Sequence, residues 1–193
     1  MSVPLVLASR SPRRAELLRQ LDVSFVVVAA DIDESPLGGE RSADYVARVA
    51  QAKATAVHDD GVAILAADTC VCVDGEIFGK PRDREDAFRM LRTLSGRWHE
   101  VHTAVALRAP NHGITATVVT TRVEFAALDD ALLEAYWATG EPADKAGAYG
   151  IQGVGGALVR RIEGSYSAVV GLPLVETRIL LDGAAVTHGL RRA

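Results

Sequence analysis

The chain has 193 residues, of which 49% are hydrophobic and 24% are charged, and its formal net charge at pH 7 is -4. This length and apolar content suffice for one sizeable core, or for one core folded as two lobes. A negative net charge argues against nucleic acid or an anionic membrane surface as the main partner, so any anion site has to be local.

The amino-terminal residues and the cysteines indicate the compartment. The first residues, MSVPLVLA, have no basic leader, and no stretch reaches the roughly 18 apolar residues that a membrane helix needs. Cys70 and Cys72 stand two apart, where they are badly placed to bridge each other, and a single C-x-C is a poor zinc site. We therefore expect a cytoplasmic protein with two reduced, structural cysteines.

Strands and helices alternate in the first half of the chain, with no repeat and no low-complexity tract. Ser11 is a good N-cap and Pro12 suits the first helical position, while Ser42 opens a helix whose apolar face includes Lys53. Asp74 and Gly75 predict a hairpin turn. The predicted elements are a strand at 3–8, a helix at 12–21, a strand at 25–29, a helix at 42–57, and, within 62–78, a buried strand, a short strand and a returning strand.

The second half continues the alternation without a visible domain boundary. Asp83 caps a helix that ends at Gly96, and Gly140 ends another helix. The remaining predicted elements are paired strands at 101–107 and 118–125, the helix at 129–139, a strand near 157–162 and a last helix that starts at Pro173. The pattern predicts a mixed α/β (α+β) fold in which residues 1–193 form one domain with two lobes and a cleft.

An anion site is predicted at the first turn of the chain's first helix, in the sequence LASRSPRR. A strand that feeds a helix N-terminus presents free backbone N–H groups, and Ser9, Ser11, Arg13 and Arg14 add hydroxyl and guanidinium donors. Two cations at the positive end of a helix dipole are otherwise unfavourable, and phosphate suits several converging donors. The alternative is that both arginines are solvated surface cations and Ser11 is only a cap.

Two charged residues lie within apolar patterns and are candidates for the same site. Asp68 stands at the end of the run VAILAAD, and a buried carboxylate needs a partner or a metal, although a turn aspartate at a strand end is the alternative. Lys53 shares the apolar face of its helix, where a snorkelling lysine is the alternative.

Further charges complete a set suited to phosphoryl transfer. The acidic loop with Asp31, Asp33 and Glu34 offers oxygens to a divalent cation, and Lys80 follows a glycine and precedes a proline. Cations for phosphate oxygens, with carboxylates for a metal and water, are what phosphoryl transfer requires. The histidines lack H-E-x-x-H spacing, and neither a Walker A motif nor a G-x-S-x-G motif occurs.

Seven segments in order along the chain resemble the Maf family of nucleoside triphosphate pyrophosphatases. They are LASRSPRRAELL, DIDE, AQAKA, AADTCVCVDGEIFGKP, LSGRWHEVHTAVAL, DKAGAYGIQG and GSYSAVVGLPL. The resemblance implies an elongated mixed sheet flanked by helices, like that of the inosine triphosphate pyrophosphatases, with a central cleft between two lobes. It also implies cleavage between the α- and β-phosphorus of a nucleoside triphosphate, with a divalent metal.

The resemblance further implies roles for individual residues. The family's proton acceptor falls on Asp68, and its phosphate and metal residues match Ser9, Arg14, Glu34, Lys53 and Lys80, with Asp68 and Glu34 at the metal. The subgroup that acts on dTTP and UTP is resembled at Arg13, Thr69 and Gln152. We expect Mg²⁺ or Mn²⁺ as cofactor, a nucleoside triphosphate as substrate, no nucleic-acid or membrane partner, and a homodimer.

Two other functions stay open at this point. One is a pyrophosphatase of the same fold that prefers 7-methyl-GTP or another purine nucleotide. The other is a nucleotide-binding regulator of cell division or shape whose hydrolysis is incidental, a role associated with the family.

Overall fold

The computed structural model describes residues 5–58, 61–110 and 113–191. Its centre is a mixed seven-stranded sheet in the order β2-β1-β3-β5-β6-β7, with β4 paired to β3. The pairs of β1 with β2 and with β3 are parallel, and the other pairs are antiparallel. The strands are β1 (Leu5–Leu7), β2 (Phe25–Val27), β3 (Ala63–Val73), β4 (Glu76–Phe78), β5 (Trp98–Ala109), β6 (Gly113–Phe125) and β7 (Val159–Glu163).

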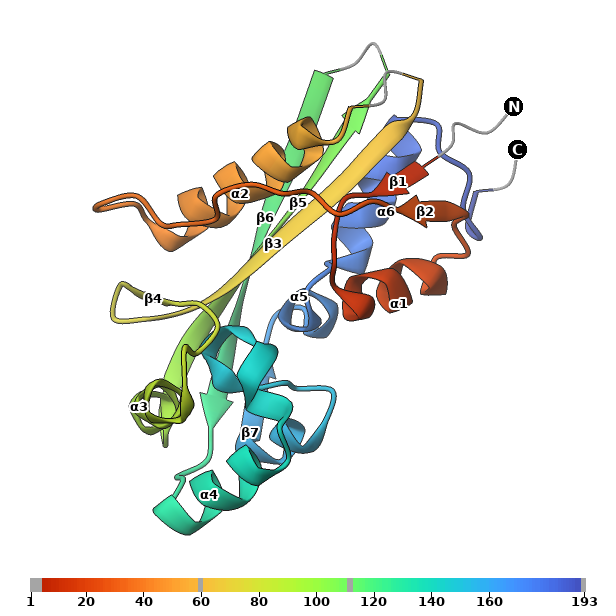
Figure 1. Ribbon diagram of the computed structural model, residues 1–193. Helices are drawn as coiled ribbons and strands as arrows, with labels where there is room; N and C mark the ends of the chain where they lie inside the picture. The colour runs from red at the N-terminus through yellow and green to blue at the C-terminus, as the bar shows by residue number, and fades with distance from the viewer. Residues whose placement is uncertain (1–4, 59–60, 111–112, 192–193) are drawn as a thin grey trace.

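Helices flank the sheet and form two lobes along it (Figure 1). The amino-terminal lobe contains β1, β2, α1 and α6, and the distal lobe contains α3, α4, β4 and β7, while the long strands β3, β5 and β6 connect them. The helices are α1 (Pro12–Gln20), α2 (Ser42–Ala56), α3 (Arg84–Leu94), α4 (Asp130–Ala138), α5 (Tyr166–Val170) and α6 (Leu174–Gly183), with 3₁₀ turns η1 (Glu141–Asp144), η2 (Ala146–Ala148) and η3 (Val154–Leu158).

Alternation along β3 assigns its residues to two different cores. Ile64, Ala66 and Cys70 pack with α2, whereas Leu65 and Ala67 pack with α1 and α6 on the opposite face. Successive side chains of a strand point to opposite faces, so β3 is apolar along most of its length because both faces are covered. A third cluster fills the distal lobe around α3 and α4.

Caps predicted from the sequence are present. Ser11 Oγ accepts from the backbone N–H of Arg14 at 3.4 Å, and Asp83 caps α3 in the same way. Asp129, predicted as the first residue of its helix, is the N-cap of α4. Ser42 is the first residue of α2, Gly96 and Gly140 have positive φ after α3 and α4, and Pro173 precedes α6. The helix-start and helix-stop signals therefore locate these boundaries to within a residue or two.

Several strand predictions need correction. The run 63–73 is one strand, not a strand followed by a second short one, because β5 pairs with it from Ile64 to Cys72 without interruption. β5 and β6 are longer than predicted, and the second predicted strand, 25–29, ends at Val27. Helix α5 and the three 3₁₀ turns were not predicted, and residues 3 and 4 of the first predicted strand lie outside the described residues.

The expectation for the cysteines is confirmed: Cys70 and Cys72 are both buried free thiols. Over the described ranges, no helix is both long enough and apolar enough to cross a membrane.

Candidate active site

A cavity of about 590 Å³ opens between the two lobes, at a gap in the sheet. On one edge of β3, β1 pairs with 63–65 and β4 pairs with 71–73, so no described strand pairs with 66–70 on that edge. Asp68 lies at the middle of this gap and Thr69 follows it. The topology therefore exposes the centre of a buried strand to a cavity, while β5 holds its other edge.

Three charged side chains from different elements meet in the wall of the cavity. Lys53 Nζ of α2 donates to Asp68 Oδ1 of β3 at 2.8 Å and also lies 2.8 Å from Glu34 Oε2. The side chains of Lys53 and Asp68 are 8% and 7% exposed, whereas that of Glu34 is 49% exposed. Lys53 is thus a buried, paired cation, and the snorkelling alternative is wrong.

Burial and charge act in opposite directions on Asp68. Burial raises the pKa of the Asp68 carboxyl above its ordinary value, although attraction to Lys53 and Arg14 opposes the shift. Its Oδ2 atom is buried and has no hydrogen-bond partner among the described residues. Asp68 is not a turn residue at a strand end, since it pairs with Ala104 within the β3–β5 ladder. A buried oxygen without a partner at a cavity is unusual and calls for a ligand.

Arg14 is fixed on the opposite face of β3. Its Nε donates to the carbonyl of Gly171 at 2.9 Å, and its two terminal nitrogens donate to Ser9 Oγ and Thr69 Oγ1, each at 3.3 Å. Burial lowers the pKa of Arg14, while Asp68 and Glu34 act to raise it. Arg14 is therefore not a solvated surface cation: it is a fixed positive charge in the cavity wall.

The other predicted residues also line the cavity. Ser11 caps α1 while Arg13 lies 3.5 Å from Asp144, so one ion pair joins the two lobes across the cavity. Lys80 follows β4 and is exposed, and Gln152 is exposed in the segment between η2 and η3. The ten predicted site residues, Ser9, Ser11, Arg13, Arg14, Glu34, Lys53, Asp68, Thr69, Lys80 and Gln152, thus gather around one cavity.

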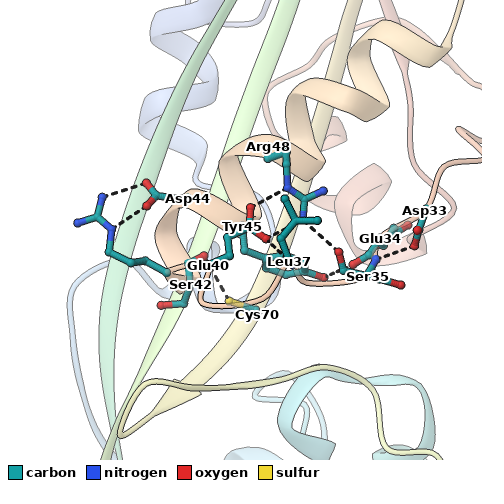
Figure 2. Close-up of polar contacts among 11 residues, drawn as sticks. Asp33, Glu34, Ser35, Leu37, Glu40, Ser42, Asp44, Tyr45, Arg48 and Cys70 are labelled. Atoms are coloured by element: carbon teal, nitrogen blue, oxygen red, sulfur yellow. Dashed lines mark hydrogen bonds and ion pairs between the residues drawn. The ribbon is translucent and has the colours of Figure 1, made fainter.

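The loop that carries Glu34 is tied to α2 (Figure 2). Arg48 donates to both carboxylate oxygens of Glu40 at 2.7 Å and to the Ser35 carbonyl at 3.1 Å. Tyr45 donates its hydroxyl to the Glu34 carbonyl at 2.9 Å. These contacts hold Glu34 against the helix that also carries Lys53.

The other two acidic residues of that loop do not join the cluster. Asp31 lies 3.7 Å from Arg10, and Asp33 accepts from the backbone N–H of Ser35 at 2.9 Å. Of the three carboxylates that the sequence offered there, Glu34 is the one paired with Lys53.

Residues that support the site were missed by the sequence reasoning. Tyr45, Arg48 and Glu141 act through contacts with loop backbone, and such contacts leave no spacing signal because their partners are main-chain groups. The Tyr45 position was readable as part of the apolar face of α2, but its hydroxyl bond was not.

The sequence of this chain is similar to curated proteins over nearly its whole length. A protein that is 55% identical over 186 residues, covering 94% of this chain and 93% of its own, is the dTTP/UTP pyrophosphatase of Methylobacillus flagellatus. The dTTP/UTP pyrophosphatase of Myxococcus xanthus is 56% identical over 184 residues, covering 94% of this chain and 93% of its own.

Among solved structures, a HAM1 protein from Coxiella burnetii has a TM-score of 0.51 and 19% identity, and the alignment covers 94% of this chain and 100% of that one. This likeness concerns the fold, a mixed sheet flanked by helices. The family model described as Maf-like protein matches residues 4–184, nearly the whole sequence. With the relatives above, that match shows that this chain belongs to the Maf family.

Proposed function

We propose that this chain hydrolyses nucleoside triphosphates, with dTTP and UTP preferred, to the nucleoside monophosphate and pyrophosphate. The observation that carries the proposal is the cluster of Glu34, Lys53 and Asp68 in the wall of a cavity that Arg14 and Lys80 also line. Relatives that are 55% and 56% identical over nearly the full chain carry the name dTTP/UTP pyrophosphatase, which supports the choice of substrate.

A divalent cation fits this cluster. Asp68 has a buried oxygen without a partner among the described residues, and Glu34 is half exposed beside it on the same lysine. Mg²⁺ is commonly held by one or two carboxylates and completed by substrate phosphates and water, and Asp68 and Glu34 offer such a pair to Mg²⁺ or Mn²⁺. When bound, the cation supplies positive charge beside the phosphoryl group under attack.

The residues divide the work of the reaction between them. Asp68 orients the attacking water at the α-phosphorus and takes its proton, and Lys53 keeps that carboxylate ionised despite its burial. Arg14 and Lys80 neutralise the charge that develops on the phosphates, with Ser9 and Ser11 as further donors. Because Arg14 is already held by three hydrogen bonds, little reorganisation is needed when the substrate binds.

We assign Gln152, Arg13 and Thr69, which also line the cavity, to recognition of the base. Thymine and uracil present an N–H donor beside a carbonyl acceptor, which is complementary to the amide of Gln152. Arg13 and Thr69 are the other two residues assigned to the base. Neither side chain offers a large aromatic surface on which a methylated guanine stacks. A homodimer, a cytoplasmic location and a single domain over residues 1–193 stay predictions.

The decisive experiment measures pyrophosphate release from a panel of nucleoside triphosphates with Mg²⁺ and with Mn²⁺. We expect the highest kcat/KM for dTTP and UTP. Asp68→Asn keeps the shape of the side chain and loses its charge, so activity falls by about 100-fold or more while the protein stays folded by circular dichroism.

Three results would contradict the proposal in different ways. Nucleotide binding without turnover in the wild type indicates a binding module, and a preference for 7-methyl-GTP indicates the purine alternative. Wild-type turnover by a folded Asp68→Asn protein removes the role of Asp68.

A further inference from the structure

The loop of residues 150–155, here called the Gln152 loop, enters the cavity without a fixed side chain at its tip. Gln152 is exposed and lines the cavity, and its amide makes no hydrogen bond to another described residue. A free glutamine amide can turn in many directions, and ordering it costs entropy when it binds. Its position is therefore set by whatever holds the backbone on both sides of it.

Two side chains from outside the loop hold that backbone. Glu141, the first residue of η1, accepts from the N–H groups of Val154 at 2.8 Å and Gly155 at 3.0 Å. The hydroxyl of Tyr136, on α4, donates to Glu141 Oε1 at 2.8 Å, and the Tyr136 hydroxyl oxygen accepts from the N–H of Gly150 at 3.0 Å. This Tyr136–Glu141 clamp binds backbone N–H groups before and after Gln152.

The loop approaches the clamp too closely for side chains. A Cβ atom at Gly153 would overlap the Glu141 carboxylate, and one at Gly155 would overlap the Tyr136 hydroxyl. The φ angles of the glycines in GIQGVG lie outside the positive region, so the backbone conformation does not require glycine at these positions. Glycine is required there because the clamp leaves no room for a side chain. A carboxylate that lies directly against bare backbone restrains the loop more tightly than a contact between two flexible side chains.

The clamp is charged and partly buried. Burial acts to raise the pKa of Glu141, but the hydrogen bonds from Tyr136, Gly155 and Val154 outweigh it, so the pKa lies below its ordinary value. Tyr136 is only 2% exposed, so its hydroxyl has a fixed position. Hydrogen bonds to an ionised acceptor are stronger than those between neutral groups.

We propose that Glu141 is a positioning residue for base recognition, which through Tyr136 and three backbone N–H groups holds Gln152 in place to meet the uracil or thymine edge. This inference rests on the proposed function and extends it to a residue outside the base contact. Within the described residues, Glu141 makes no hydrogen bond or ion pair with Ser9, Ser11, Arg14 or Lys80, and the cavity cation that it contacts, Lys145, is bound through the main-chain carbonyl of Glu141. We therefore expect Glu141 to act on which base is accepted and not on the chemical step.

The test replaces Glu141 by glutamine, which keeps the shape but turns one acceptor oxygen into a donor that faces backbone N–H or the Tyr136 hydroxyl. We expect the ratio of kcat/KM for UTP to that for CTP to fall about three- to tenfold, with a higher KM for UTP and a nearly unchanged kcat. Glu134→Gln is the matched control, because Glu134 lies on α4 in the same lobe but pairs with Arg84 on the surface.

A double-mutant cycle with Gln152→Leu separates positioning from general support. If Glu141 acts through Gln152, the Glu141→Gln change has no further effect on the UTP-to-CTP ratio once Gln152 is leucine. Tyr136→Phe, which removes only the hydroxyl, gives a weaker change in the same direction. The Tyr136→Phe variant also tests the clamp if the Glu141→Gln protein does not fold.

Some outcomes overturn the inference. Equal losses for UTP and CTP, or additive effects in the cycle, mean that the clamp only supports the fold. Calorimetric binding of non-hydrolysable UTP and CTP analogues to the same variants measures discrimination independently of turnover. A wild type that binds both analogues equally refutes the inference, whereas one that discriminates but releases no pyrophosphate refutes the proposed function alone.

Discussion

At the scale of single residues, the site depends on a lysine shared between two carboxylates. Lys53 lies 2.8 Å from both Asp68 and Glu34, and the Lys53–Asp68 pair is buried. A buried ion pair adds little net stability, but removing one partner leaves a charge without compensation. The pair is therefore better understood as a device that keeps Asp68 ionised at neutral pH than as a source of stability.

Lys53→Met tests this directly. Losing the ammonium raises the pKa of Asp68 further, so the acidic limb of kcat/KM moves to higher pH. A carboxyl whose pKa is higher in the folded than in the unfolded state destabilises the fold as the pH rises from the unfolded-state pKa to the folded-state pKa. The free energy of unfolding of Lys53→Met is therefore lower than that of the wild type by about 2–4 kcal/mol at pH 8, and by less at pH 5. Urea titrations at the two pH values measure the difference.

The double variant Lys53→Met with Asp68→Asn is the control for that prediction, since it removes the unpaired carboxylate as well. It recovers most of the lost stability at pH 8. Equal destabilisation of Lys53→Met at pH 5 and pH 8 would show that lost packing, not charge, is the cause.

At the scale of elements, the loop with Glu34 and helix α2 act as one unit. Arg48 binds Glu40 with two hydrogen bonds and the Ser35 carbonyl with a third, and its guanidinium lies 5.7 Å from the centre of the Tyr45 ring (Figure 2). The Arg48 guanidinium, with the N–H of Leu37, lowers the pKa of Glu40 to about 2, so the Glu40 carboxylate stays ionised at pH values well below neutrality.

Arg48→Met is expected to free the loop from α2. Hydrogen exchange of residues 33–40 increases, and kcat/KM falls about three- to tenfold because Glu34 is no longer held beside Lys53. Arg41→Met is the matched control, since the guanidinium of Arg41, the N-cap residue of α2, pairs with Asp44 at 2.7 Å and makes no hydrogen bond to another described residue. Similar exchange and kinetics in the two variants would contradict the assigned role of Arg48.

At the scale of the whole molecule, a buried histidine behind the cavity wall links stability to pH. His99 on β5 is 3% exposed, packs edge-on against Phe125 and Tyr149, and hydrogen-bonds the Tyr149 hydroxyl through Nε2 at 2.8 Å. Burial, with a smaller contribution from Arg97, lowers the pKa of His99 to about 4. The unfolded chain therefore takes up a proton at higher pH than the folded one.

The expected result is a loss of stability on acidification that requires His99. Between about pH 6.5 and 4 the unfolded state binds more protons at this residue, so the free energy of unfolding falls by about 3 kcal/mol. The difference between wild type and His99→Gln, measured by urea titration across this range, isolates the contribution from that of the carboxylates. Parallel curves for wild type and His99→Gln would contradict the assignment.

Local patterns determined a large part of this protein. Caps and glycines located the ends of α1, α3 and α4, and Lys53 on an apolar helix face and Asp68 within an apolar run were detectable as misplaced charges. Ordered motifs across nearly the whole chain gave the Maf family and the ten cavity residues. The caps, the glycines and the misplaced charges depend on neighbours in the sequence, which hydrophobic period and capping report directly, whereas Thr69 and Gln152 were implied by the resemblance to the family.

Tertiary structure alone decided how those residues act together. Sheet register leaves 66–70 unpaired with any described strand on one edge of β3, which opens the centre of that strand to the cavity. Arg14 reaches the Gly171 carbonyl 157 positions away, and the Tyr136–Glu141 clamp binds main-chain N–H groups that no side-chain pattern marks. Strand pairing and long-range contacts with backbone depend on the packing of the whole chain, because any residue offers the same N–H and C=O groups.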